Sequence, residues 1–289
     1  MTGRVLVTGA TGFLGQALLR RLGARAIGQG RDAGRLAALR QQGFDTVQWC
    51  LPEAAPQEPI LQEVTAIVHC AALSSPFGPA KAFQQANVAG TQAVLDFAQQ
   101  RGVKRFVYVS SPSIYFALAD QLHVAEDMPL PRPFNAYAAS KVAAEHRVLG
   151  RPELGPVIIR PRGLYGAGDT ALLPRLLRTA KERALPRFRD GRACIDLTYV
   201  EDVVDSLLAA LDAGAVAEGK AFNVSGGEVL PISEIVQRVC DKAKTPLRWR
   251  KMPLRPALIA AGAAEHSPVV GKFVTCNAVE CVIIALARK

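Results

Sequence analysis

Tyr137 and Lys141 stand four residues apart in a segment of strong helix formers, residues 135–145. Residues at this spacing share one face of a helix, so the phenol and the ammonium group can point into one site. A free tyrosine has a reference pKa of about 10, and a neighbouring cation lowers it because it favours the phenolate. Such a phenol gives a proton to a ketone oxygen or takes one from an alcohol. Taken alone, the pair also fits a half-buried tyrosine beside a surface lysine.

A glycine-spaced loop near the N-terminus is suited to hold a dinucleotide. Gly9, Gly12 and Gly15 follow a short apolar run over residues 4–8 and open an amphipathic segment over residues 13–22. In a strand–turn–helix unit, glycines let the backbone approach a pyrophosphate, and the helix N-terminus offers free N–H groups to it. The spacing is G-x-x-G-x-x-G rather than the G-x-G-x-x-G of the general fingerprint. The flanking strand and helix favour a nucleotide site over a plain turn.

Three serines follow another apolar run, residues 106–109, which reads as a buried parallel strand. They are Ser110, Ser111 and Ser113. Ligands of open α/β sheets bind at the carboxyl ends of the strands, where these hydroxyls are placed. A serine there can hydrogen-bond a substrate oxygen and help hold its developing charge.

These motifs together resemble the extended short-chain dehydrogenases/reductases, part of the NAD-dependent epimerase/dehydratase superfamily. Further matches follow in order at residues 68–72, 87–91, 160–161, 197–203 and 222–224, so the resemblance runs from about residue 4 to 249. It implies that Ser111 is catalytic, because this serine stands four residues before Tyr115. It also implies that Tyr137 is the acid/base and that Lys141 bonds the nicotinamide ribose. Residues 111–116 look most like the branch of 3β-hydroxysteroid dehydrogenases and 2-alkyl-3-oxoalkanoate reductases.

The cofactor is expected to be NADP, with NAD as the alternative. An NAD enzyme places an acid at the end of its second strand to bind the adenine ribose, but Gly30 takes that position here and Arg31 follows it. A guanidinium suits a 2′-phosphate through paired, charge-assisted hydrogen bonds. Asp32 is the acid if the strand ends later. The residues expected at the cofactor are Gly9, Thr11, Gly12, Phe13, Leu14, Gly15, Arg31, Ala71, Ala72, Asn87, Tyr137, Lys141 and Pro161.

Alternating strands and helices predict a doubly wound, Rossmann-like parallel sheet, classed as α/β, with a smaller substrate lobe. We expect residues 1–165 to form the dinucleotide-binding domain, with 194–226 returning to it. Residues 166–193 and 227–289 then form the substrate lobe and the C-terminal tail. One long helix is expected over residues 81–100, and another over 169–184. Asn87 either tethers backbone near the active site or is a simple helix-surface amide.

Composition fits a cytoplasmic enzyme with a small-molecule substrate. Hydrophobic residues make up 49% of the 289, which is enough for a buried core, and no apolar stretch reaches the roughly 18 residues of a membrane span. The chain starts directly with the first strand, so no signal peptide is expected. The six cysteines lack zinc-type spacing, so we expect reduced thiols and no metal.

The net charge of +10 favours anionic ligands, and no nucleic-acid reader motif is present. The tail from about Ala257 has no counterpart in the family and leaves open a helix, a homodimer or membrane-surface contact, or an altered terminus.

The sequence predicts an NADP-dependent ketone reductase that acts on a β-keto acid or a hydroxysteroid-like substrate. Residues 160–166 lack the asparagine usual in the sugar-nucleotide members of the family, which favours this reading. The alternatives are a nucleotide-sugar epimerase or dehydratase with tightly held NAD, and a non-catalytic dinucleotide sensor. The intact set of Ser111, Tyr137 and Lys141 argues against the sensor, which has no need of all three.

Overall fold

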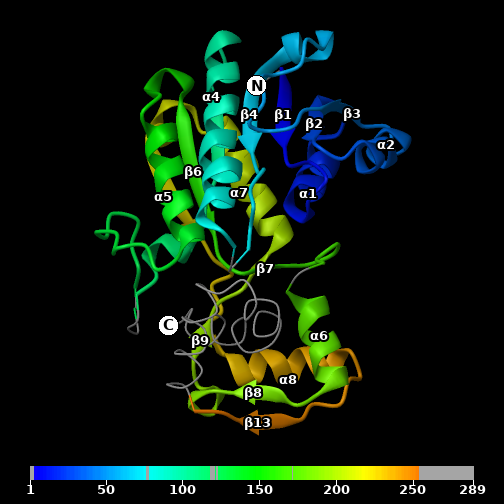
Figure 1. Cartoon of the computed structure of the whole chain (residues 1–289), viewed down its shortest axis with the longest axis vertical. Coiled ribbons are helices and arrows are strands. Elements are labelled where there is room, and N and C mark those ends of the chain that lie inside the picture. Colours follow the sequence, from blue (N-terminus) through cyan, green and yellow to red (C-terminus); the bar gives the residue numbers. More distant parts are fainter. Residues whose placement is uncertain (1–2, 76–77, 118–120, 122, 171, 254–289) are drawn as a thin grey trace.

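The computed structural model describes residues 3–75, 78–117, 121, 123–170 and 172–253. Its centre is a seven-stranded parallel sheet in the order β11-β6-β5-β4-β1-β2-β3 (Figure 1). The strands are β1 (Arg4–Thr8), β2 (Ala26–Gly30), β3 (Asp45–Gln48), β4 (Val64–His69), β5 (Phe106–Val109), β6 (Pro156–Pro161) and β11 (Lys220–Val224). Because the sheet extends in both directions from β1, the predicted doubly wound, Rossmann-like α/β fold is confirmed.

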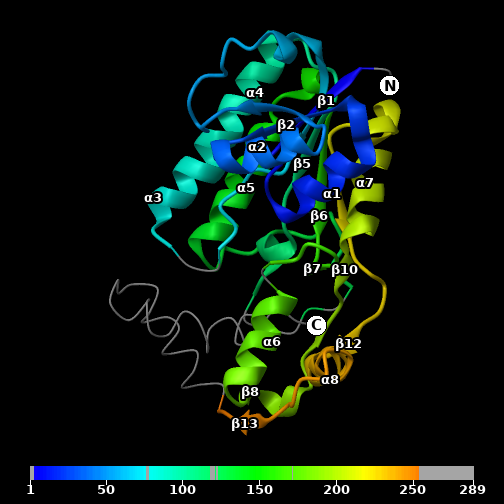
Figure 2. The same cartoon turned by 90° about the vertical axis from the view of Figure 1, so that its right-hand side faces the viewer.

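Helices cover both faces of the sheet (Figures 1 and 2). One face carries α1 (Phe13–Leu22), α2 (Ala33–Gln41) and α7 (Val200–Asp212), and the other carries α3 (Ala80–Phe83), α4 (Gly90–Gln100) and α5 (Ala136–Leu149). Successive side chains of a strand point to opposite faces, so Val5 and Val7 join the first core while Leu6 joins the second. Burial on both faces explains why the inner strands β1, β4, β5 and β6 read as apolar runs.

The single helix predicted over residues 81–100 is interrupted. Between α3 and α4 the backbone forms a π-helical segment, Gln84–Ala89, with a wider turn than an α-helix. Asn87 lies inside this segment and is buried, with 1% of its surface exposed. The second long helix, predicted over residues 169–184, is shorter. It is α6 (Leu173–Glu182), and the Asp169 carboxylate accepts hydrogen bonds from the backbone N–H groups of Leu172 and Leu173 at its start.

A smaller lobe lies beyond the carboxyl edge of the sheet (Figure 1). It contains α6, β8 (Leu185–Arg187), α8 (Ile232–Lys242) and β13 (Trp249–Lys251), and β8 pairs with β13. A second short pair joins β9 (Cys194–Ile195) to β12 (Leu230–Pro231). The lobe has a core of its own, formed by Ala180, Leu185, Val236 and Cys240.

A third short pair, β7 (Leu164–Tyr165) with β10 (Thr198–Tyr199), follows β6 and leads towards this lobe. The tail from Ala257, which the sequence singled out, lies outside the described residues. Among the residues that the structure describes, no helix has the length and apolarity that a membrane crossing needs.

Candidate active site

The glycine loop after β1 forms a cradle that side chains would fill. Gly9 has a φ of +65°, and a Cβ there would lie 2.8 Å from the backbone of Ala71, which follows β4. A Cβ on Gly15 would lie 2.4 Å from the carbonyl oxygen of Gly9. The glycines are therefore needed for the close approach of the loop to β4 and α1.

The start of α1 is open to an anionic group. Gly12 precedes the first helical residue, and no side chain among the described residues caps its N–H groups. A helix N-terminus with uncapped N–H groups and the positive end of the helix dipole suits a phosphate. Thr11, Phe13 and Leu14 line the same turn. This cradle fits the dinucleotide that the sequence predicts.

The Tyr137 hydroxyl forms side-chain hydrogen bonds with Ser111 and Ser74. Tyr137 lies in the first turn of α5, and the Asn135 side chain caps this helix by accepting a hydrogen bond from Ala138 N–H at 2.8 Å. Ser111 directly precedes η4 (Pro112–Tyr115), at the carboxyl end of β5. Burial raises the pKa of the Tyr137 phenol, and the hydrogen bonds to Ser111 and Ser74 oppose this rise.

Lys141 is buried, and its ammonium group is held by β5 rather than by Tyr137. Its Nζ donates hydrogen bonds to the Val109 carbonyl at 2.9 Å and to the Tyr108 hydroxyl at 3.3 Å. It also lies 4.9 Å from the centre of the Tyr108 ring. Burial lowers the pKa of Lys141 to about 8, against the opposing effects of Cys70 and Glu145. The pKa of the Tyr137 phenol is raised, with burial as the largest cause, and not lowered as the spacing with Lys141 predicts.

The neighbouring serines differ from Ser111. The Oγ atoms of Ser110 and Ser113 are buried, and neither has a hydrogen-bond partner among the described residues. Ser113 uses its backbone N–H instead, which donates to Ser111 Oγ at 3.2 Å. Of the three serines, Ser111 is therefore the one that is hydrogen-bonded to the phenol within the described part of the chain.

Asn87 is a tether, the first of its two predicted roles. Its Oδ1 accepts from Leu73 N–H at 2.7 Å, and its Nδ2 donates to the Leu73 carbonyl at 3.1 Å and to Ser140 Oγ at 2.9 Å. Ser140 in turn donates to the Tyr137 carbonyl at 2.7 Å. Asn87 therefore ties the loop after β4 to α5. Direct contact of Asn87 with a cofactor stays a prediction.

A buried histidine behind the site had no role in the sequence interpretation. His69 Nδ1 lies 2.6 Å from Thr8 Oγ1, and its Nε2 lies 3.0 Å from Thr91 Oγ1. Thr91 donates its own proton to the Asn87 carbonyl at 2.6 Å, so it accepts from Nε2, and Nδ1 accepts from Thr8. Burial, followed by the charge of Lys141, lowers the pKa of His69 to about 3. The neutral imidazole thus links β1, β4 and α4.

A buried ion pair anchors the far end of α5, and the sequence did not predict it. Arg160 on β6 binds both carboxylate oxygens of Glu145 on α5, at 2.9 and 2.6 Å. The same guanidinium donates to the Tyr115 hydroxyl. Tyr115 donates to Asn223 Oδ1 at 3.2 Å, which extends the network to β11. The bidentate geometry is the strong form of an arginine–carboxylate pair.

The acid nearest the end of β2 is already engaged. The strand ends at Gly30, and Asp32 caps α2 by accepting a hydrogen bond from Arg35 N–H at 2.9 Å. The carboxylate proposed as the alternative ribose ligand therefore serves as a helix cap. Arg31 and Arg35 are exposed beside it.

The remaining predicted residues also lie after strands of the main sheet. Ala71 and Ala72 follow β4, and Ala71 N–H donates to Thr8 Oγ1 at 3.2 Å. Pro161 is the last residue of β6 and pairs with Val224 of β11. The predicted loop residues thus follow β1, β2, β4 and β5 at one edge of the sheet, and Pro161 ends β6 there. Tyr137, Lys141 and the buried Asn87 come from the helical segments beside this edge.

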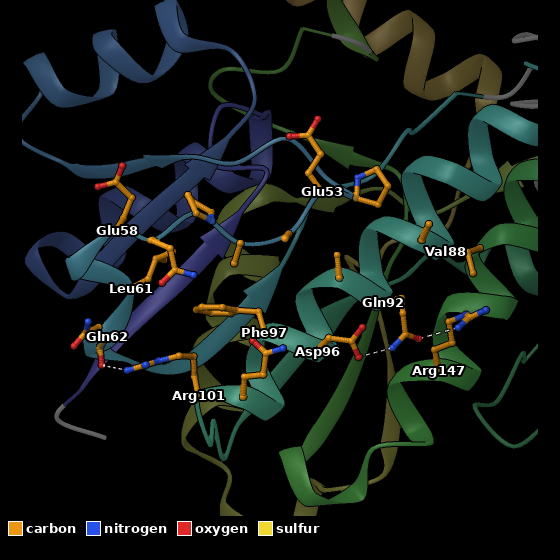
Figure 3. A pocket seen from close by; sticks show the side chains of 18 of the residues that line it. Glu53, Glu58, Leu61, Gln62, Val88, Gln92, Asp96, Phe97, Arg101 and Arg147 are labelled. Atoms are coloured by element: carbon orange, nitrogen blue, oxygen red, sulfur yellow. Dashed lines mark hydrogen bonds between the residues drawn. The ribbon is translucent and has the colours of Figure 1, made fainter.

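A cavity of about 790 Å³ lies away from this edge (Figure 3). It lies between the segment of residues 52–62 and the outer side of α4, with Arg147 of α5 at its rim. Gln92 bridges Asp96 and Arg147 there by hydrogen bonds of 2.8 Å each. None of the predicted site residues lines it, so this cavity is separate from the candidate active site.

Comparison with known proteins places the chain in a family. Residues 5–225 match the model of the NAD dependent epimerase/dehydratase family, and the chain belongs to this family. A 2-alkyl-3-oxoalkanoate reductase of Stenotrophomonas maltophilia is 33% identical, over 84% of this chain and 76% of that protein. A decarboxylating sterol-4-alpha-carboxylate 3-dehydrogenase of Bos taurus is also 33% identical, over 82% of this chain and 68% of that protein.

A solved structure is also similar to this chain. The structure of a dTDP-glucose 4,6-dehydratase double mutant from Streptomyces venezuelae, with NAD bound, has a TM-score of 0.74 and 26% identity, covering 86% of this chain and 84% of that one. The predicted family and its reductase branch are confirmed, and the protein is an NAD(P)-dependent enzyme of the extended short-chain dehydrogenase/reductase type.

Proposed function

We propose that the protein is an NADP-dependent reductase of ketones that uses Tyr137 as its acid. The observation that carries the proposal is the hydrogen bond between Tyr137 and Ser111 at the edge of the sheet where the glycine cradle opens. A proton donor and an oxygen-binding hydroxyl thereby face one position, as carbonyl reduction requires.

The residues of the cradle would hold the dinucleotide. Gly9, Gly12 and Gly15 leave room for the pyrophosphate at the start of α1. Arg31 and Arg35, exposed on either side of Asp32, would bind a 2′-phosphate through their guanidinium groups. When bound, the reduced nicotinamide supplies a hydride to the carbonyl carbon.

The side chains of the site have separate roles in the reduction of the carbonyl group. Tyr137 donates its phenolic proton to the carbonyl oxygen, and Ser111 donates a hydrogen bond to the same oxygen. Burial raises the pKa of Tyr137 and keeps the phenol protonated, which suits an acid in the reductive direction. Lys141 of α5, whose ammonium group donates to the Val109 carbonyl of β5, would bind the nicotinamide ribose.

A β-keto acid or a hydroxysteroid-like compound is the proposed substrate. The two named relatives act, by their names, on an alkyl oxoalkanoate and a sterol carboxylate, which share an apolar body, a carboxylate and an oxygen at the third carbon. The substrate would bind between the sheet edge and the smaller lobe.

The proposed division assigns residues 1–165 and 194–226 to the dinucleotide domain, and 166–193 and 227–289 to the lobe and tail. A cytoplasmic location is proposed, supported by free thiols at Cys50, Cys70, Cys194 and Cys240.

The test is the loss of NADPH absorbance with a panel of β-keto acids and ketosteroids, and NADH in parallel. We expect consumption with NADPH, and a shift in preference towards NADH in Arg31→Ala. Tyr137→Phe should abolish turnover while it still binds NADPH. Near-normal turnover of Tyr137→Phe would refute the acid role, and an unchanged cofactor preference in Arg31→Ala would refute the 2′-phosphate site.

A nucleotide-sugar epimerase or dehydratase is the second candidate, favoured by the likeness to the dTDP-glucose 4,6-dehydratase structure. Such an enzyme reduces and reoxidises its cofactor within one turnover. Nucleotide sugars that change identity with no net loss of NADPH absorbance would support it over the ketone reductase.

A further inference from the structure

The positive charge of the chain is concentrated in one part of the molecule. Residues 172–193 and 229–253, here called the basic lobe, hold thirteen basic and four acidic side chains, a net +9 of the chain's +10. They include α6, β8, α8 and β13. Residues 1–171 and 194–228 hold 18 basic and 19 acidic side chains, so the rest of the molecule up to residue 253 is almost neutral.

These charges lie on the surface at one end of the molecule. β8 and β13 form the end farthest from the main sheet in both views (Figures 1 and 2). Pro186 and Arg187 pair there with Arg250 and Lys251. The exposed basic residues of the lobe are Arg175, Arg178, Lys181, Arg183, Arg189, Arg192, Arg238, Lys242, Lys244, Arg248, Arg250 and Lys251.

Some of the cations of the lobe have acidic partners among the described residues, and others have none there. Lys251 lies 3.5 Å from Asp190, and Arg238 pairs with Glu228 and Glu234. No ion pair to a described acidic residue is found for Arg248, Arg250 or Lys242. A concentration of uncompensated cations on one end attracts a polyanionic surface.

The aromatic residues of the lobe favour a lipid surface over a nucleic acid. Single-stranded nucleic acids are bound by exposed aromatic rings on which the bases stack. Phe188 is 3% exposed, and Trp249 is half-buried with the Arg187 guanidinium 5.8 Å from its ring centre. The described part of the lobe therefore offers no stacking platform. An anionic bilayer needs none, because basic side chains near its surface are attracted by its negative potential.

We propose that the basic lobe docks the enzyme peripherally on anionic membranes. The proposal rests on the proposed function, because an apolar ketone with a carboxylate partitions into bilayers and would be met at their surface. Docking through the lobe would bring this end of the substrate-binding part to the lipid while the main sheet remains in water.

The experiment is co-sedimentation of the full chain with vesicles of phosphatidylcholine alone, and of phosphatidylcholine with phosphatidylglycerol at a ratio of about two to one. We expect binding to the anionic vesicles only, and its loss at high salt. The triple variant Lys242→Gln, Arg248→Gln and Arg250→Gln should bind at least about tenfold more weakly. The matched control removes three exposed charges elsewhere: Arg20→Gln, Lys104→Gln and Lys220→Gln.

Equal weakening of the two triple variants, equal binding to both kinds of vesicle, or tighter binding to a single-stranded oligonucleotide would each overturn the proposal. NADPH consumption with a water-soluble ketone is measured on the same samples. Reductase activity without vesicle binding refutes the docking alone. Vesicle binding without reductase activity refutes the proposed function alone.

Discussion

Ser110 and Ser111 are neighbours in the chain, but their hydroxyls meet different surroundings. Ser111 is hydrogen-bonded to Tyr137, whereas the Ser110 Oγ is buried without a partner among the described residues. We expect Ser111→Ala to lower kcat by about 10²–10³-fold, as the loss of one donor to a developing oxyanion does. Ser110→Ala should leave kcat nearly unchanged. Steady-state kinetics with one reducible ketone compares them, and similar losses in both would contradict the role of Ser111.

The surroundings of Lys141 predict the alkaline limit of the reaction. Burial lowers its pKa to about 8, so the ammonium group is lost as the pH rises through this value, and the rate should fall there. The groups that face it are Tyr108 and Val109 of β5, His69 and Cys70 at the end of β4, and Glu145 on its own helix.

Tyr108→Phe keeps the aromatic ring and removes one acceptor of the ammonium group. Because the charged form loses a hydrogen bond, the alkaline limb of kcat should move to lower pH. A pH profile of kcat for both proteins tests this. An unchanged limb in Tyr108→Phe would show that the hydroxyl does not support the charge.

Sequence spacing found Tyr137 and Lys141 because both stand on one helix, where a separation of four fixes a shared face. It could not show where the ammonium points. Its partners lie 32 and 33 residues away in the chain, on a strand that only the sheet brings beside α5. The sequence also did not predict the contacts of His69 with Thr8 and Thr91, or the pairing of Arg160 with Glu145. In each of these cases the partners come from different elements that only the fold brings together.

Among the elements, the turn from β1 into α1 has little room for a side chain. A Cβ on Gly15 would lie 2.4 Å from the Gly9 carbonyl oxygen and 2.8 Å from the Ala10 Cα, and these backbone atoms cannot rotate away as a flexible side chain could. We expect Gly15→Ala to weaken NADPH binding at least about tenfold and to lower the Tm, because α1 must shift away from the loop.

Gly34→Ala is the matched control, since it lies in α2 where a Cβ meets no atom closer than 3.4 Å. Alanine favours the helix by about 0.5–1 kcal/mol, so this variant should be as stable as the parent or more so. NADPH titration and thermal unfolding of both variants provide the measurement. Equal behaviour of the two would mean that the turn tolerates a side chain.

The elements also show where sequence patterns stop being informative. The boundaries of α1 and β5 follow from apolar runs and glycines, both of which are local signals. The π-helical segment Gln84–Ala89 does not, because every residue in it is compatible with an ordinary helix. What distinguishes it is the buried Asn87, whose main partner Leu73 is 14 residues away in a loop.

At the scale of the whole molecule, the net charge proved less informative than its distribution. A total of +10 was compatible with anionic ligands or with a solvated surface. Only the fold shows that residues 172–193 and 229–253, separate in the chain, come together in one lobe that carries +9. The docking proposal depends on that assembly and on no single residue.

The stability of the whole molecule should fall in acid because of His69. Its pKa is about 3 in the folded protein and about 6.5 in an unfolded chain. Between these values the unfolded state binds a proton that the folded state excludes, so the free energy of unfolding decreases as the pH falls. Below about pH 6.5 the loss approaches 1.4 kcal/mol for each pH unit, down to about pH 3.

His69→Gln isolates this contribution, because glutamine keeps a hydrogen-bond donor and an acceptor between Thr8 and Thr91 but does not titrate. The variant should be less stable than the parent at neutral pH, and its free energy of unfolding should depend less on pH over the acid range. His146→Gln, a change of an exposed histidine on α5, is the control and should keep the slope of the parent. Urea unfolding measured at intervals across this range decides the question. Parallel pH curves for the parent and His69→Gln would mean that the buried imidazole does not set the acid limit of the fold.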